Sequence, residues 1–130
     1  MSDAPNDPHL NLSWPFSEEG IRHHQKMVSD LAYVTFFAFD NTIAVGHIVG
    51  GQKKVSYRDV KIAEIVEMGI SPSHRSQGIG SQLIVTLRRW CKERGYQKLM
   101  VNAYCNNSKA IEFYQRQGLT PIDIDLEMDL

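Results

Sequence analysis

The sequence lacks the features that would indicate a membrane protein, a secreted protein or a nucleic-acid-binding protein. No apolar run approaches the roughly 20 residues that a membrane-spanning helix needs. Lys and Arg number 14 against 15 Asp and Glu, so there is no basic surplus to bind the phosphates of a nucleic acid. The first residues contain neither a basic segment nor an apolar one, so no secretory signal is visible.

Cysteine is also scarce. The two cysteines, Cys91 and Cys105, have neither the spacing of a metal site nor that of a redox pair. We therefore expect a cytoplasmic protein that binds no metal. The remaining composition, 42% hydrophobic and 22% charged over 130 residues, is typical of one globular domain with one core.

The pattern of residues divides the chain into an amino-terminal arm, residues 1–16, and a single domain, residues 17–130. The arm is rich in Pro, Asp and Asn. Leu10 to Trp14 alternate with polar neighbours, which predicts a short strand. Ser17 is a suitable N-cap for a helix that would open the domain.

A β-hairpin is predicted next. Tyr33 to Phe39 and Ile43 to Val49 are rich in β-branched and aromatic residues, and the turn pair Asp40-Asn41 separates them. Residues 50–61 contain two glycines and many polar residues, which predicts a loop.

The rest of the domain alternates between strands and helices. The predicted elements are a strand at 62–70, a helix from Gly80 to about Arg94, a strand at 98–103, a helix from Asn106 to Gly118, and a final strand from Ile122 to Met128. This order, an antiparallel hairpin followed by β-α-β-α-β, predicts an α/β fold with a mixed sheet.

A glycine-containing turn, Arg75-Ser76-Gln77-Gly78-Ile79-Gly80, joins the strand at 62–70 to the following helix. The first turn of a helix has unpaired N–H groups and the positive end of the dipole, so it can bind a phosphate. Glycine at 78 and 80 would let the phosphate approach the backbone. Alternatively, the two glycines only turn the chain, since neither common nucleotide-binding fingerprint is complete here.

Two spaced motifs resemble those of the GNAT N-acetyltransferase superfamily. The family's cofactor signature is Gln or Arg, then Gly three residues later and Gly or Ala five residues later, which matches the turn from Arg75 to Gly80. A second signature has Ala three, Tyr seven and Gly eleven residues after Asn, and it matches Asn107-Ala110-Tyr114-Gly118. The resemblance covers about residues 31 to 130.

This resemblance implies a GNAT acyl-CoA N-acyltransferase fold in which the strands at 62–70 and 98–103 are parallel and splay apart to admit acetyl-CoA. A bulge near Glu67 or Met68 would suit such a splay. The resemblance assigns acetyl-CoA binding to Met68, Gly69, Ile70, Arg75, Ser76, Gln77, Gly78, Ile79, Gly80, Ser81, Asn107 and Tyr114.

The implied reaction is direct attack of a primary amine, on a small molecule or a peptide, on the acetyl thioester. Glu64 is the preferred general base because the run from Ala63 to Val66 resembles the base-bearing strand of histone-type members, and Glu67 is the second candidate. By strict alternation the two side chains point to opposite faces of the strand. Tyr114 occupies the family position of the acid that protonates the leaving thiolate.

Several alternatives stay open. Glu64 could be a solvated strand carboxylate and Tyr114 a packing residue, in which case the chain would be a non-catalytic acyl-CoA-binding or regulatory domain. The partners expected are acetyl-CoA and an amine acceptor. The final strand, with acidic residues on one face, and an exposed sheet edge would also allow a homodimer.

Overall fold

The structure is a computed structural model that describes residues 32–130. The predicted arm at 1–16, its short strand and the helix from Ser17 lie outside the described residues, and the boundary between arm and domain stays a prediction. Within the described range, no helix has the length and apolar character needed to cross a membrane.

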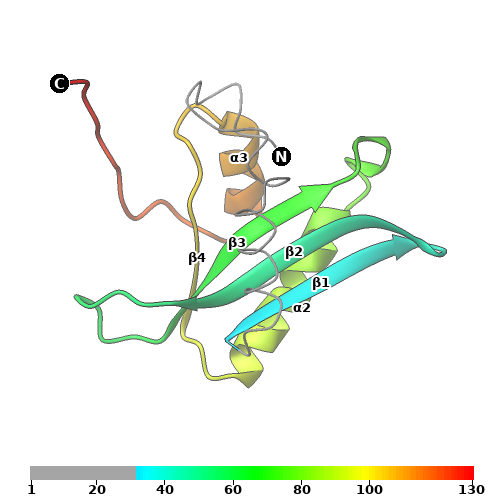
Figure 1. Ribbon diagram of the computed structural model, residues 1–130, viewed down its shortest axis with the longest axis horizontal. Coiled ribbons are helices and arrows are strands. Elements are labelled where there is room, and N and C mark those ends of the chain that lie inside the picture. The colour runs from blue at the N-terminus through cyan, green and yellow to red at the C-terminus, as the bar shows by residue number, and fades with distance from the viewer. Residues whose placement is uncertain (1–31) are drawn as a thin grey trace.

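The described chain forms a four-stranded sheet with two helices (Figure 1). In chain order, the elements are β1 (Tyr33–Asp40), β2 (Ile43–Lys53), β3 (Ile62–Ile70), a 3₁₀ turn (Pro72–His74), α2 (Ile79–Glu93), β4 (Lys98–Val101) and α3 (Ser108–Arg116).

The strands lie in the order β1-β2-β3-β4. The first three are antiparallel neighbours, whereas β3 and β4 are parallel, so the mixed sheet predicted from the sequence is confirmed. Parallel pairing joins Ile62–Ile65 to Lys98–Val101 and then stops, although β3 continues to Ile70. Over residues 66–70, no strand in the described part of the chain lies on the β4 side of β3. This is the predicted splay.

The hairpin turn is confirmed, but β2 is longer than expected. Asn41 has a φ of 56°, a left-handed conformation that asparagine tolerates well in a tight turn. The strand continues through Gly50 and Gly51 to Lys53 rather than giving way to a loop at residue 50. A Cβ on Gly50 would lie 2.5 Å from Leu87 Cδ1, so this glycine lets α2 approach the sheet closely.

The core lies between the sheet and α2. The apolar stripe of α2 predicted from the 3.6-residue period packs against β2 and β3. The buried residues of this cluster are Ile48, Ala63, Ile65, Leu83, Ile84, Leu87 and Cys91.

The predicted final strand, Ile122 to Met128, is wrong as an element of this chain's own sheet. Residues 119–130 have no regular secondary structure, and residues 120–130 are all exposed. Figure 1 shows this segment leading away from the sheet toward the carboxyl terminus. An alternating pattern becomes a strand only where a partner strand supplies backbone hydrogen bonds, and this segment has none within the described chain.

Candidate functional site

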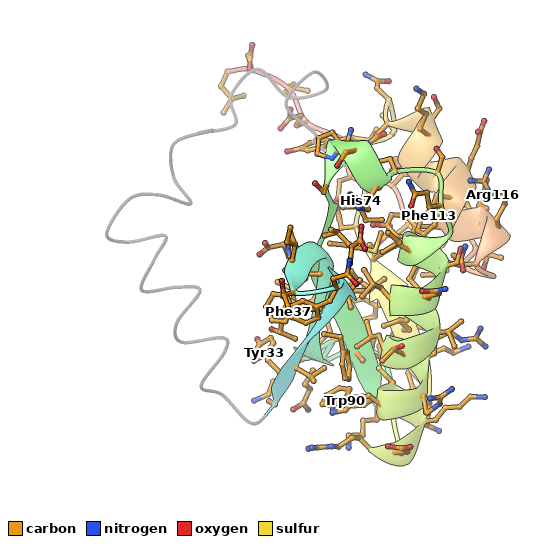
Figure 2. The ribbon with its side chains drawn as sticks, turned by 90° about the vertical axis from the view of Figure 1, so that its right-hand side faces the viewer. Tyr33, Phe37, His74, Trp90, Phe113 and Arg116 are labelled. Carbon is orange, nitrogen blue, oxygen red and sulfur yellow. The ribbon has the colours of Figure 1, made fainter. Side chains whose placement is uncertain are left out.

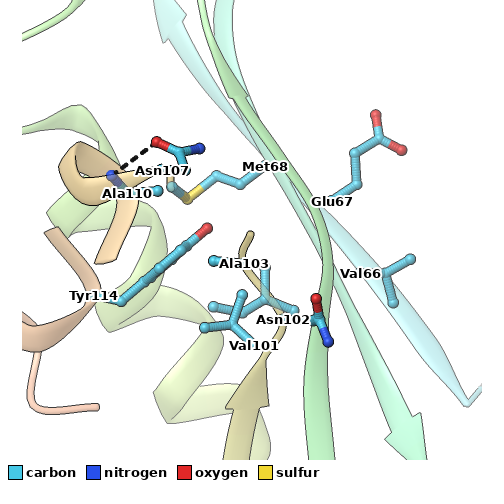
Figure 3. Close-up of a pocket in the computed structure, with 10 residues that line it drawn as sticks. Val66, Glu67, Met68, Val101, Asn102, Ala103, Asn107, Ala110 and Tyr114 are labelled. Atoms are coloured by element: carbon cyan, nitrogen blue, oxygen red, sulfur yellow. Dashed lines mark hydrogen bonds between the residues drawn. The ribbon is translucent and has the colours of Figure 1, made fainter. Parts of the chain in front are cut away.

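A cleft of about 220 Å³ opens where the pairing between β3 and β4 ends (Figure 3). Its walls come from β3, from the chain just after β4 and from one face of α3. The lining residues are Ile65, Val66, Glu67, Met68, Val101, Asn102, Ala103, Asn107, Ala110 and Tyr114. The splay therefore produces a real cavity between the two parallel strands.

The start of α3 positions the far wall of this cleft. Asn107 is the N-cap, and its side-chain oxygen accepts a hydrogen bond from the Ala110 N–H at 3.3 Å. Asn107, Ala110 and Tyr114 are spaced by three and four residues, so they lie on one face of the helix. Figure 3 shows the Tyr114 ring in the cleft with its hydroxyl directed toward β3. The sequence motif thus places three of its members on the cleft wall.

The turn before α2 has the backbone of an anion site. Ser76 has a φ of 63° and Gly78 a φ of 81°, both in the left-handed region. A Cβ built on Gly78 would meet no other atom within 4 Å, so the space beside this backbone is open. Unpaired N–H groups at the start of a 15-residue helix face the same region. The predicted use of Gly78, to leave room beside the backbone, fits this geometry.

Gly80 has a packing role that the sequence interpretation did not include, and its contact with a phosphate stays a prediction. A Cβ there would lie 3.0 Å from Phe113 Cζ and 3.2 Å from Ile70 Cδ1, so the missing side chain lets α2 pack against α3. Ser81 is also turned toward α3, where its hydroxyl accepts a hydrogen bond from Gln117 Nε2 at 2.9 Å. These two positions connect the anion turn to the helix that carries Tyr114.

The other predicted cofactor residues divide between the cleft and the turn. Met68 lines the cleft. The carbonyl of Ile70 accepts a hydrogen bond from Arg75 Nε at 3.3 Å, which anchors the arginine beside the turn. The side-chain Nε2 of Gln77 donates a hydrogen bond to the Ser73 carbonyl at 3.4 Å, and this contact stabilises the turn.

At Gly69 a side chain would point away from the cleft, and the side chain of Ile79 does so. A Cβ on Gly69 would lie 2.8 Å from His47 Cε1, on the opposite face of the sheet. The Ile79 side chain packs against the core near Gly46. Only the backbone groups of these two residues are therefore available to a molecule in the cleft or at the turn.

An extra residue in β3 changes the direction of the two candidate bases. Glu67 pairs with Val49 and Glu64 with Gly51, so the four residues 64–67 of β3 lie opposite the three residues 49–51 of β2. The surplus residue, Val66, makes the bulge predicted beside Glu67. Because Val49 and Gly51 point to the same face of the sheet, both glutamates do too, and strict alternation is broken.

The two glutamates nevertheless have different surroundings. Glu64 lies beside the paired part of β3, and its carboxylate accepts a hydrogen bond from Lys53 Nζ at 3.3 Å. Glu67 lines the cleft where the pairing has ended. Figure 3 shows its side chain on the side of β3 opposite to Tyr114. Of the two candidates, Glu67 and not the preferred Glu64 borders the cleft, and its carboxylate lies on the other face of the sheet beside His47.

The sequence interpretation missed His47, whose ring nitrogen lies 2.8 Å from a carboxylate oxygen of Glu67. His47 is on β2 and pairs with Phe37 of β1, with ring centroids 6.5 Å apart. Phe37 is 56% exposed and lies on the same face, away from α2 and α3 (Figure 2). Only the strand register brings these residues together, and no local motif marks them.

The cleft contains groups suited to proton transfer, and the turn before α2, which does not line it, has open space beside its backbone. No cluster of three or more His, Cys, Asp or Glu side chains that could hold a metal ion occurs among residues 32–130.

Comparisons with known proteins agree with this arrangement. The model of the acetyltransferase (GNAT) family matches residues 2–119. The chain is 27% identical over 120 residues to the amino-acid acetyltransferase of Escherichia coli strain K12 and 26% identical over 121 residues to that of Salmonella typhi. The alignments cover 90% of this chain and 25% of each relative, so the chain spans about a quarter of the length of the curated relatives it matches.

Solved structures show the same fold. A putative acetyl transferase from Pyrococcus furiosus has a TM-score of 0.79 at 23% identity, over 94% of this chain and 83% of that one. The aminoglycoside N-acetyltransferase AAC(6')-Iy in complex with CoA has a TM-score of 0.75 at 17% identity, over 90% of each chain. The predicted fold class is therefore confirmed.

Proposed function

The chain belongs to the acetyltransferase (GNAT) family, and we propose that it transfers an acetyl group from acetyl-CoA to the primary amine of a small molecule or peptide. The observation that carries the proposal is the cleft at the end of the β3–β4 pairing. It has Tyr114 and Asn107 on one wall and Glu67 at its opposite mouth.

Acetyl-CoA fits the residues that this chain supplies. Its pyrophosphate would bind the turn at residues 76–81, where the open space beside Gly78 and the start of α2 favour an anion. Arg75 adds a cation next to this turn. The pantetheine arm would bond to the backbone of residues 68–70, whose β4 side has no strand beside it in the described chain. When bound, acetyl-CoA supplies the thioester that is broken.

Glu67 would act as the general base on the acceptor. Free alkyl amines are mostly protonated at neutral pH, so a proton must leave the nitrogen before it can attack. The carboxylate would take it directly or through one water. His47, at 2.8 Å, would hold the carboxylate in place, because hydrogen bonds to a charged group are short and directional. Glu64 is less suited to this role, since Lys53 binds it away from the cleft.

Tyr114 would protonate the CoA thiolate that leaves. As the C–N bond forms, the C–S bond breaks and its electron pair leaves on sulfur. The tyrosine hydroxyl, directed into the cleft, would give its proton to this thiolate. The nitrogen loses its second surplus proton to water, because Glu67 already holds the first, and Tyr114 regains a proton from water. The products are an amide, the CoA thiol and one proton that Glu67 releases to solvent.

The acceptor would approach from the sheet face that bears His47 and Glu67. Its rim contains the exposed rings of Phe37 and Phe39, whose centroids are 6.3 Å apart. An apolar rim around a carboxylate suits a cationic amine attached to an apolar or amphipathic body. The relatives named amino-acid and aminoglycoside acetyltransferases make amino acids and aminoglycosides the first acceptors to test.

A direct test is CoA release from acetyl-CoA with amino acids, aminoglycosides, polyamines and short peptides as acceptors. We expect turnover with at least one primary amine and none with the N-acetylated form of the same compound. If acetyl-CoA binds tightly but no acceptor gives turnover above the rate of hydrolysis, the chain is an acyl-CoA-binding domain and the proposal is wrong.

A further inference from the structure

We propose that Gln117, at the end of α3, is a positioning residue for acetyl-CoA. Its side chain binds the Ser81 hydroxyl, so that the proton of this hydroxyl is free to be donated to the cofactor's pyrophosphate. This role rests on the proposed function, because it requires that the pyrophosphate binds at the turn before α2. The contact that carries it is the hydrogen bond of 2.9 Å from Gln117 Nε2 to Ser81 Oγ, between residues 36 positions apart in the sequence.

Ser81 lies in the first turn of α2, among the groups that can bind an anion. The helix follows its N-cap, Gly78, and the N–H of Gln82 donates to the Gly78 carbonyl at 3.1 Å. The N–H groups of residues 79–81 come before this bond and are the ones left for a ligand. Because Cα–Cβ bonds in a helix tilt toward its N-terminus, the Ser81 hydroxyl lies beside these N–H groups.

The hydrogen bond from Gln117 uses a lone pair of the Ser81 hydroxyl and not its proton. A serine hydroxyl has one proton to donate and two lone pairs that accept. Thr86, on the same helix, donates its proton to the Gln82 carbonyl at 2.9 Å, which is a common arrangement inside helices. Ser81 has no such bond to an acceptor among residues 32–130. Its proton is therefore available to a ligand at the start of α2.

Gln117 is well placed to hold this hydroxyl, because the backbone on both sides of the contact is fixed. It is the C-cap of α3, and its N–H is shared by the carbonyls of Phe113 and Tyr114, each at 3.1 Å. The ring of Phe113 packs where Gly80 has no side chain, so α3 lies beside the first turn of α2 (Figure 2). The Gln117 side chain is half-buried there and loses little further freedom when it binds Ser81.

Loss of the Gln117 amide should therefore weaken the binding of acetyl-CoA and leave the transfer step unchanged. Without it, the Ser81 hydroxyl could rotate and donate to a backbone carbonyl of its own helix, as Thr86 does, and this bond would compete with the phosphate. A hydrogen bond to a charged phosphate is stronger than one to a neutral acceptor, so its loss should be measurable. If the contact only packs α3 against α2, its loss would instead affect every substrate alike.

Calorimetric titration with CoA tests the link between the two residues. We expect Ser81→Ala to raise the Kd about tenfold and Gln117→Ala about fivefold, with no further effect of Gln117→Ala in the Ser81→Ala background. Gln117→Glu can only accept, so it would take the Ser81 proton and should raise the Kd at least tenfold. Gln115→Ala, at an exposed glutamine of the same helix, is the matched control and should bind like the wild type. Wild-type affinity in Gln117→Ala, or an undiminished effect in the Ser81→Ala background, would overturn the proposal.

Turnover of S-acetylpantetheine, which has the thioester but no pyrophosphate, separates positioning from packing. Gln117→Ala should lower kcat/KM for acetyl-CoA about fivefold at unchanged kcat and leave kcat/KM for S-acetylpantetheine unchanged. An equal loss with both thioesters would overturn the role of Gln117. A wild type that binds CoA but acetylates no amine would contradict the proposed function alone, and the titration would still decide this role. A wild type that does not bind CoA would contradict both.

Discussion

The two faces of the sheet carry different kinds of candidate residue. On the face that α2 and α3 cover, the candidate cofactor residues lie in two short stretches of the chain. On the opposite face, Glu67 and His47 are 20 residues apart in the sequence and meet only because their strands pair. The first side is built from helix starts: a glycine turn before α2 and an asparagine cap before α3. The second is built from the register of three strands and from one bulge.

This difference explains which functional residues can be recognised in a sequence. A helix start needs particular residue types at fixed spacing, because the N–H groups and the cap lie within one or two turns. A cross-strand contact needs only that two strands pair in one register, and many sequences satisfy that. We therefore expect the two sides to respond separately to mutation, one in acetyl-CoA binding and the other in turnover.

The largest effect should come from Glu67→Gln. Removing the base should lower kcat by about 10²- to 10⁴-fold and leave the Kd for acetyl-CoA unchanged. Glu64→Gln is the matched control and should stay within about twofold of wild type, since its half-buried pair with Lys53 is still in contact with solvent and contributes little. Steady-state kinetics and calorimetric titration measure the two quantities. A greater loss of kcat in Glu64→Gln than in Glu67→Gln would show that Glu64 is the general base.

Tyr114→Phe should have the next largest effect. Loss of the proton donor should reduce kcat by about 10²-fold, the lower end of the range for such groups, because a thiolate leaves readily. Tyr57→Phe removes the same hydroxyl from an exposed loop residue and should change nothing. Unchanged turnover in Tyr114→Phe would show that this residue only packs.

Gly78→Ala tests acetyl-CoA binding on the face of the sheet that α2 and α3 cover. The alanine would have to adopt a left-handed conformation, which costs about 1–2 kcal/mol, and its Cβ would fill the space beside the turn. The KM for acetyl-CoA should therefore rise roughly tenfold while kcat stays unchanged. Gly95→Ala is a close control, because Gly95 has a φ of 79° and open space as well but lies after α2. It should lower stability by a similar amount without changing KM.

His47→Gln should have a smaller effect, confined to turnover. Losing one hydrogen bond to Glu67, worth about 1 kcal/mol, should lower kcat about fivefold while the KM for acetyl-CoA stays the same. In the Glu67→Gln background the same change should have no further effect. An equal loss in both backgrounds would mean that His47 does not act through Glu67.

The smallest effect should come from the cysteines. Burial raises the pKa of the Cys91 thiol and shields it from reagents, so Cys91 should react with iodoacetamide at pH 8 only when the protein unfolds. Mass spectrometry of the labelled protein measures this. Cys105→Ser should keep full turnover, since no covalent intermediate is proposed, and a loss of more than tenfold would indicate a role for that thiol.

Much of the fold could be predicted because its signals are local. The hairpin turn at Asp40-Asn41, the period of α2 and the asparagine cap of α3 each depend on a few neighbouring residues. Gly50 was assigned to a loop, because the residue it approaches, Leu87, is far away in the sequence. The final strand was predicted from alternation alone, which cannot tell whether a partner strand is present.

The candidate site could be predicted in part for the same reason. The glycine turn before α2 and the common face of Asn107, Ala110 and Tyr114 could be predicted from spacing, and anion binding at the turn stays a prediction. The sequence favours Glu64 over Glu67 as the base, but it could not show which of the two borders the cleft. The bulge at Val66 follows from the β2–β3 register, and one sequence does not give a register. His47 was missed on that account as well.

Hydrogen exchange with and without CoA tests most directly whether the cofactor lies on the α2–α3 side of the split sheet. We predict slower exchange at the amides of residues 68–70 and 77–81 when CoA is bound, with exchange in β1 and at His47 unchanged. Slower exchange in β1 and at His47, without a change at residues 77–81, would contradict this account.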